Sequence, residues 1–292
     1  MLILGDEGHY HGRFPWVTAS LVVINVAVYV AQVMLGPGFT LSYALVPGEL
    51  PMLREIVEAH HHGTAPDLRG PNDRPKFTIT NGPSLDAAPK FYCPSPVLTL
   101  FTSLFLHADI FHLIGNMWFL LVFGRNVECA MNHGLFFAFY LTCGVAAGLA
   151  HSFSDVYSII PCIGASGAIS GIMGAYISIH PFNKIKVWLF IAVLEVPALI
   201  VIGLWFVQNY VSAMLSLEVT VNNGGVAYWA HLGGFVAGFV ILRMLILCLQ
   251  WKHRAAGPAG KPMAAAKNDE ADPFATFMTV QTVRKIREQQ SD

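Results

Sequence analysis

Four polar side chains lie in strongly apolar stretches of the sequence and could together perform chemistry. Ser166 and His231 are the types that form a nucleophile and its general base, because a serine hydroxyl is a weak nucleophile until an adjacent base takes its proton. His112 and Asn116 are four residues apart, share one face of a helix and could donate hydrogen bonds to an oxyanion. This set predicts acyl transfer with Ser166 as nucleophile, His231 as base, and His112 and Asn116 as transition-state support.

The composition indicates that a membrane must hold these residues. Hydrophobic residues make up 54% of the 292 residues and charged residues only 12%, whereas soluble domains carry about 25% charged residues. The net charge is -1 and the basic residues are scattered, which argues against a nucleic-acid partner. We therefore expect an all-α polytopic membrane protein surrounded by the lipid bilayer.

Apolar runs long enough to cross about 30 Å at 1.5 Å per residue predict six spans. They cover roughly 16-35, 110-128, 134-151, 166-180, 187-208 and 226-250. The fourth is short, so its outer end should start below the membrane surface, next to chain that is buried in protein or lines a wet cavity.

Basic residues orient these spans. Lys184 and Lys186 between spans four and five, and Lys252 after span six, are expected on the cytoplasmic side. Both termini are then cytoplasmic, and the active site opens to the outer side.

The resulting organisation has three parts. A cytoplasmic segment 1-15 precedes a membrane domain 16-251 that contains a long outer loop 37-109, and a cytoplasmic tail 252-292 follows. A bacterial cytoplasmic membrane is the expected location.

Spans two, four and six run in the same direction in this topology, so the four polar side chains should lie at similar depth. Small residues on spans four and six would let the two backbones approach closely and bring Ser166 to His231. These residues are Gly164, Gly167, Gly171, Gly234 and Gly238.

Glu195 is the only carboxylate that this assignment puts deep in a span, two residues before Pro197. Intramembrane acids are functional candidates by default, so it could affect gating. A structural role beside a proline kink is the favoured interpretation.

At these residues the chain resembles the rhomboid family of intramembrane proteases. The resemblance lies in LHADIFHLIGN (106-116), GRNVE (124-128), GASGAISG (164-171) and AHLGGFVAG (230-238). It implies a six-transmembrane-helix bundle and a Ser/His dyad without a third acid. It further implies cleavage of peptide bonds in or near the transmembrane segments of single-pass membrane proteins, without a cofactor or metal.

One position departs from the family pattern. Family members often carry an aromatic residue four positions after the nucleophile, beneath the catalytic histidine, whereas this chain has Ser170. We therefore expect another group, such as Tyr228 or Trp229, to orient His231.

Other classes of membrane protein fit this pattern less well. A catalytically silent relative that binds membrane clients is the main alternative, although such proteins usually lack the serine or the histidine. A transporter would be expected to place its polar groups near the midplane. A zinc protease would need HExxH, which the sequence lacks. The sequence leaves the oligomeric state open.

Overall fold

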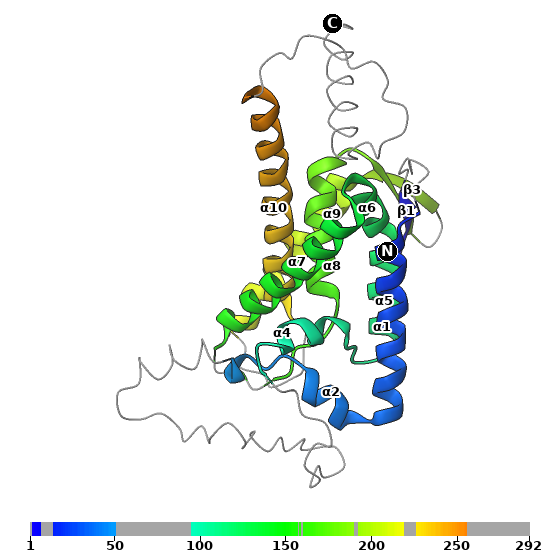
Figure 1. Cartoon of the computed structure of the whole chain (residues 1–292). Helices are drawn as coiled ribbons and strands as arrows, with labels where there is room; N and C mark the ends of the chain where they lie inside the picture. The colour runs from blue at the N-terminus through cyan, green and yellow to red at the C-terminus, as the bar shows by residue number, and fades with distance from the viewer. Residues whose placement is uncertain are drawn as a thin grey trace, which may run out of the picture.

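The computed structural model describes a helical bundle with a small sheet at one end (Figure 1). The described residues are 2–6, 14–50, 95–156, 158, 160–189, 192–218 and 226–255. Most of the predicted outer loop 37-109 and of the tail 252-292 lies outside them.

Six apolar helical segments build the bundle. They are α1 (Trp16–Leu35), the continuous run α5 (Ile110–Phe119), η3 (Leu120–Gly124) and α6 (Arg125–Ala130), then α7 (His133–Ser154), α8 (Ser166–Ile179), α9 (Ala198–Glu218) and α10 (Tyr228–Ala255). Within the described residues, five of these segments are long and apolar enough to cross a membrane, and α8 is a shorter apolar helix. The prediction of a helical, multi-pass membrane bundle with a short fourth helix is confirmed.

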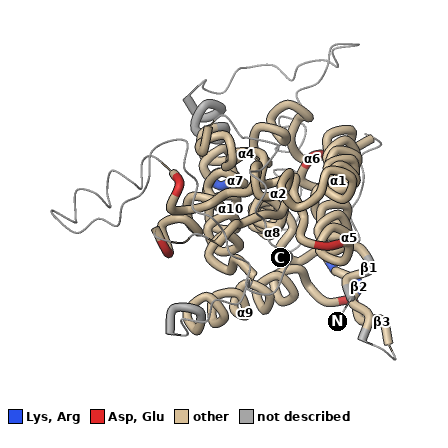
Figure 2. Tube along the Cα trace, turned by 90° about the horizontal axis from the view of Figure 1, so that it is seen from below, with Lys and Arg blue, Asp and Glu red and all other residues tan. Residues whose placement is uncertain are grey.

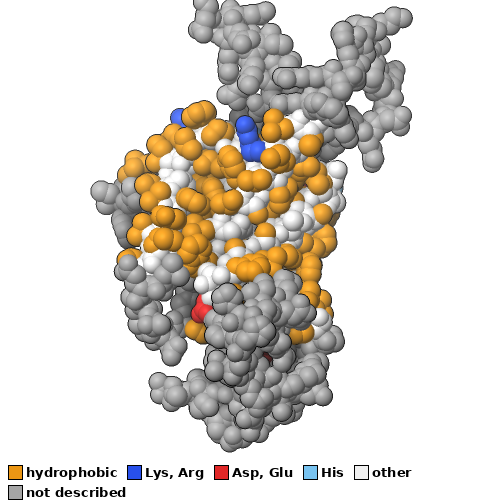
Figure 3. Space-filling model, turned by 90° about the vertical axis from the view of Figure 1, so that its left-hand side faces the viewer, with side chains coloured by type: hydrophobic (Ala, Val, Ile, Leu, Met, Phe, Trp, Pro, Cys, Tyr) orange, Lys and Arg blue, Asp and Glu red, His pale blue; other side chains and the backbone are white. Residues whose placement is uncertain are grey.

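The surface of the bundle is suited to lipid. Most of the described chain carries no charged side chain (Figure 2), and apolar side chains predominate on the face seen in Figure 3. Large apolar residues such as Val23, Leu204 and Phe111 are more than half exposed. An apolar exterior of this extent is expected where hydrocarbon replaces water as the solvent.

Short helices close the end of the bundle opposite the sheet (Figure 1). They are α2 (Pro37–Tyr43), η1 (Pro47–Glu49), α4 (Thr99–Thr102) and η2 (Ser103–Phe105). Among them, η2 contacts α8, whereas α4 and η1 pack against α7 and α2 packs against α1.

The predicted span 187-208 was wrong in its first half. The chain there forms two strands, β2 (Lys184–Leu189) and β3 (Ala192–Pro197), and α9 begins only at Ala198. In β2, Ile185 and Val187 are buried while the alternate side chains are exposed, which is the period of a strand. An apolar run of this length is compatible with either a strand or a helix, so the sequence alone did not separate the two.

The predicted N-terminal segment supplies the third strand of this antiparallel sheet, in the order β1-β2-β3. The side chain of Asp6 at the end of β1 (Leu2–Asp6) accepts hydrogen bonds from Asn126 Nδ2 and Tyr176 Oη, each at 2.6 Å. Trp118 Nε1 donates to the carbonyl of Ile3 at 2.5 Å. The first residues of the chain are therefore tied to α5, α6 and α8.

Glu195 lies on β3 rather than inside a helix, so its prediction as an intramembrane carboxylate was wrong. Its side chain is exposed and pairs with Lys184 at 3.1 Å. The gating hypothesis depended on an acid within a span and therefore loses its premise.

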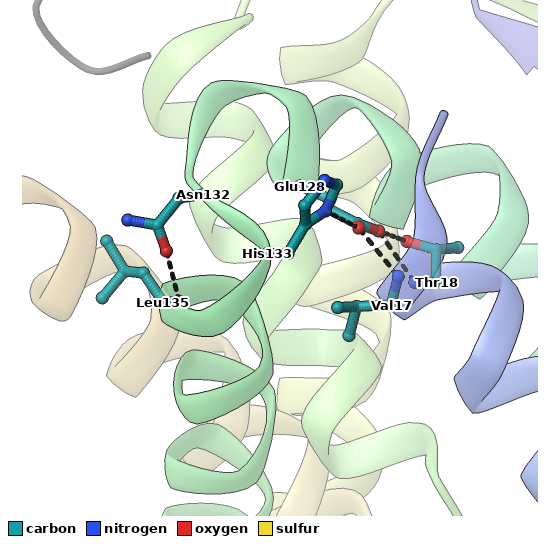
Figure 4. A network of polar contacts seen from close by, with 6 residues as sticks. All are labelled: Val17, Thr18, Glu128, Asn132, His133 and Leu135. Carbon is teal, nitrogen blue, oxygen red and sulfur yellow. Dashed lines mark hydrogen bonds and ion pairs between the residues drawn. The ribbon is translucent and has the colours of Figure 1, made fainter. Parts of the chain in front are cut away.

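A buried carboxylate, Glu128, joins α1 to α6 at the same end of the bundle as the sheet (Figures 1 and 4). Glu128 accepts hydrogen bonds from the backbone N–H groups of Val17 and Thr18 at 2.8 and 2.7 Å, and from Thr18 Oγ1 at 2.6 Å. His133 Nδ1 lies 2.6 Å from Glu128 Oε1, the oxygen that also accepts from Val17. Because the first N–H groups of a helix have no partner within it, Glu128 serves as the missing cap of α1.

Candidate active site

Helix α8 is the central helix of the bundle, and every residue from Gly167 to Tyr176 is buried. It packs chiefly against α10 and α7. A Cβ atom added at Gly234 would overlap the carbonyl oxygen of Gly167, and one at Gly238 would overlap that of Gly171. The two backbones therefore touch, as helices do at small-residue interfaces in membranes.

This close approach brings Ser166 and His231 together. Ser166 is the first residue of α8, and His231 is in the first turn of α10. The Ser166 Oγ atom lies 2.9 Å from His231 Nε2. This distance is that of a hydrogen bond, the contact that a nucleophile and its base require.

The loop before Ser166 is fixed by backbone hydrogen bonds. Cys162 and Leu45 exchange two bonds, of 2.7 and 3.1 Å, and the N–H of Gly164 donates to the carbonyl of Ser103 at 2.9 Å. Burial raises the pKa of the Cys162 thiol to about 12, so this thiol stays protonated and does not compete as a nucleophile.

Gly164 differs from the other four glycines because it lies in the loop and not between two helices. Its φ of +129° is a conformation that favours glycine. An added Cβ would lie 2.9 Å from His112 Cε1, 3.0 Å from His112 Nε2 and 3.7 Å from Ser166 Oγ. The absence of a side chain here allows the imidazole of His112 to lie beside the Ser166 hydroxyl.

Asn116 lies one turn after His112 on α5 and is 8% exposed. Its Nδ2 atom has no hydrogen-bond partner among the described residues. A buried donor without a partner costs free energy, and such exceptions call for an explanation in function.

Asp109 holds the start of α5. It caps the helix by accepting hydrogen bonds from the N–H groups of Phe111 and His112 at 2.8 and 2.9 Å. The hydrogen bond from the His112 N–H contributes most to holding the pKa of Asp109 below its usual value. The cap therefore remains ionised and aligns the turn that carries His112.

His107, just before α5, is anchored to α1 and contacts the ring of His112. Gln32 Nε2 donates to the carbonyl of His107 at 3.0 Å, and Gln32 Oε1 accepts from its N–H at 2.9 Å. Burial, aided by His112, lowers the pKa of His107 to about 4, so its ring is neutral near pH 7. The ring contacts that of His112 edge-on, with 5.2 Å between centroids.

The second nitrogen of His231 has a partner that sequence analysis missed. His231 Nδ1 lies 2.7 Å from Asn209 Oδ1 on α9, and the ring of Trp205 packs against the imidazole at a centroid distance of 5.8 Å. Asn209 and Trp205 thus make the contacts that we had expected from Tyr228 or Trp229. An amide within an apolar stretch was the signal that could have identified Asn209, but the predicted span ended at residue 208, whereas α9 runs to Glu218.

Ser170, which replaces the aromatic residue of the family pattern, makes its hydrogen bond within α8. Its Oγ donates to the Ser166 carbonyl within α8 at 2.7 Å. Across the described ranges, no group of three or more His, Cys, Asp or Glu side chains could hold a metal ion.

The fold and the cluster define a helical, multi-pass membrane protein with a half-buried Ser–His pair. A family model described as "Rhomboid domain" matches residues 94–248. The chain therefore belongs to the rhomboid family.

Named relatives share this similarity. The chain is 26% identical over 263 residues to "RHOMBOID-like protein 1" of Arabidopsis thaliana, covering 87% of this chain and 60% of that protein. It is 32% identical over 170 residues to "Rhomboid protease GluP" of Bacillus subtilis, covering 57% of this chain and 28% of that protein. "Rhomboid protein 1, mitochondrial" of Saccharomyces cerevisiae is 29% identical over 48% of this chain and 40% of its own length.

The chain thus spans less than two thirds of the length of these relatives. Several of them are plant or mitochondrial proteins, so they do not support the predicted bacterial cytoplasmic membrane.

Proposed function

We propose that this protein is an intramembrane serine endopeptidase that hydrolyses peptide bonds in or near the transmembrane segments of single-pass membrane proteins. The observation that carries the proposal is the 2.9 Å contact between Ser166 Oγ and His231 Nε2 at the touching ends of two helices. Family membership and the similarity to a relative named as a protease support it.

The first chemical step is acylation. His231 Nε2 takes the proton of Ser166 Oγ as the oxygen attacks the carbonyl carbon of the scissile bond. The resulting oxyanion needs donors that are already oriented, because donors that must reorganise during the reaction stabilise charge poorly. Asn116 Nδ2, which has no partner among the described residues, is suited to this role.

His112 and the first N–H groups of α8 are further candidate donors to the oxyanion. The His112 ring lies next to Gly164, two residues before Ser166. The N-terminus of α8 adds the positive end of the helix dipole. The protonated His231 then gives its proton to the leaving amine, and a water molecule activated by His231 hydrolyses the acyl-enzyme. No cofactor is required for these steps.

The proposal includes a topology. Both termini are cytoplasmic, and the site opens toward the outer side through the end of the bundle that carries α2 and α4. Lys184 and Lys186, which the positive-inside rule assigns to the cytoplasm, lie in the sheet at the opposite end.

The decisive experiment is labelling with a fluorophosphonate, a serine-hydrolase probe that needs no known substrate. The detergent-solubilised wild type should be labelled, whereas Ser166→Ala and His231→Ala should lose labelling by at least about 10³-fold with unchanged thermal unfolding. Ser170→Ala is the matched control, because this hydroxyl lies one turn further on the same helix, and its labelling should equal that of the wild type.

Labelling that survives in Ser166→Ala would show that another serine is the nucleophile. A folded wild type that is not labelled would favour a catalytically silent protein that binds membrane clients.

A further inference from the structure

The contact between Asn209 and His231 bears on both the position of the imidazole ring and the location of its proton. Asn209 is 6% exposed on a helix whose neighbouring residues Val207, Tyr210 and Val211 are about half exposed. Its side chain therefore points from an otherwise lipid-facing stretch of α9 toward α10. An amide placed in this way has to find hydrogen-bond partners inside the protein.

The two ends of this amide have different partners. Asn209 Nδ2 lies 2.8 Å from the carbonyl oxygen of Trp205, one turn earlier on α9. A carbonyl oxygen only accepts hydrogen bonds, so the NH₂ group must face it. The Oδ1 atom is then the end that faces His231 Nδ1, at 2.7 Å.

This orientation fixes the proton on His231. Because Asn209 Oδ1 can only accept, the short contact to it requires a proton on Nδ1. In the neutral imidazole the other nitrogen, Nε2, then carries the lone pair. Nε2 is the atom 2.9 Å from Ser166 Oγ, so the lone pair points at the proton it has to remove.

We propose that Asn209 is a positioning residue that selects the Nδ1–H tautomer of His231 and holds its ring for proton transfer from Ser166. The inference rests on the proposed function and extends it from a dyad to a chain of three residues, Ser166, His231 and Asn209. Trp205 supports both residues, because its carbonyl oxygen orients the Asn209 amide and its ring packs against the His231 imidazole.

A neutral amide fits this role in a membrane. A carboxylate would stabilise the protonated imidazole more strongly, but burying a charge in this position would be costly. Among the described residues, His112 on α5 and His151 on α7 are ionisable side chains near His231. An amide does not add a net charge to this cluster of histidines.

The test compares fluorophosphonate labelling rates as a function of pH for wild type and three variants of the 292-residue chain. Asn209→Ala removes the acceptor and should slow labelling about tenfold to a hundredfold, the range of one buried hydrogen bond expressed as a rate. Gln208→Ala is the matched control on the same turn of α9, where the side chain is exposed, and should label at the wild-type rate.

Asn209→Asp is the diagnostic variant. It keeps an acceptor at Nδ1 and should recover most of the rate at high pH. The new carboxylate favours the protonated imidazole, which cannot act as a base, so the acid limb of the pH profile should move to higher pH. A shift of this limb shows that the side chain at position 209 contacts the imidazole, and recovery of the rate at high pH shows that the base requires the hydrogen-bond acceptor.

Several outcomes would overturn the inference. If wild type and Asn209→Ala label at the same rate across the pH range, Asn209 has no role in orienting the base, although the proposed function stands. If Asn209→Ala unfolds, the pH dependence of labelling in Asn209→Asp still tests the inference. An acid limb identical to that of the wild type would mean that Asn209 is only a packing residue. If the wild type itself is not labelled, the proposed function and this inference fail together.

Discussion

Two polar clusters among the described residues, one around Glu128 and one around Ser166, differ in how completely their hydrogen bonds are satisfied. At Glu128 the carboxylate accepts from two backbone N–H groups and a hydroxyl and also contacts His133 (Figure 4). At the other cluster, Asn116 Nδ2 has no partner among the described residues.

The difference has a physical meaning. A satisfied network stabilises the fold, because breaking any member leaves a buried group unpaired. A donor kept without a partner costs stability in the resting protein, but it can stabilise charge that develops in a reaction without first giving up another bond. The two clusters should therefore respond to mutation in opposite ways.

The substitution expected to separate the two clusters most clearly is Asn116→Ala, through its effect on the reaction rate. Labelling or turnover should fall by about 10²–10³-fold, the typical contribution of one oxyanion donor, and by less if His112 compensates. Thermal unfolding should stay at or slightly above the wild-type temperature, because the substitution removes a buried donor that has no partner. A variant with undiminished turnover would refute the assignment of Asn116.

Glu128→Ala should show the reverse pattern. The loss of one acceptor leaves the N–H groups of Val17 and Thr18 and the Thr18 hydroxyl unpaired, which should lower the free energy of unfolding by about 3 kcal/mol. The labelling rate per folded molecule should not change. Both can be measured by thermal unfolding in detergent alongside probe labelling.

Asn132→Ala provides a matched control for Glu128→Ala. Asn132 also caps a helix, accepting from the N–H of Leu135 at 2.7 Å, but at an exposed site beside Glu128 (Figure 4). Its loss should cost only about 1 kcal/mol. Equal effects of the two variants would mean that burial of the Glu128 network is unimportant.

The smallest expected effect concerns the interface that joins α8 and α10. The Cβ atom in Gly238→Ala would overlap the carbonyl oxygen of Gly171, so the helices must separate, at a cost of about 1–3 kcal/mol. Gly203→Ala on α9 is the control, because an added Cβ there meets nothing within 4 Å. The control should be neutral or more stable by up to about 1 kcal/mol, as expected for alanine in a helix.

If Gly238→Ala unfolds at the same temperature as Gly203→Ala, the close approach of the two helices is not required for stability. If it lowers stability and labelling together, the interface also sets the distance between Ser166 and His231.

Much of the bundle could be predicted because a membrane imposes simple rules on a sequence. The span predicted at 16-35 is α1 (Trp16–Leu35), and the short fourth span begins at Ser166 as expected. The sheet could not be foreseen. Residues 187–194 form an apolar run that is short enough for either structure, and β2 pairs with β1 across about 180 residues of sequence.

The sequence by itself determined the membrane class, the small-residue contacts between two helices, and the four polar residues that gather at one end of the bundle. These follow from composition and spacing, because apolar length decides what spans a bilayer and a missing Cβ decides how closely helices approach. The tertiary structure alone decided which groups complete the two clusters. Asn209 reaches His231, and Glu128 reaches the first turn of α1, because hydrogen bonds between separate helices depend on how the helices are rotated and packed, and no local pattern encodes that.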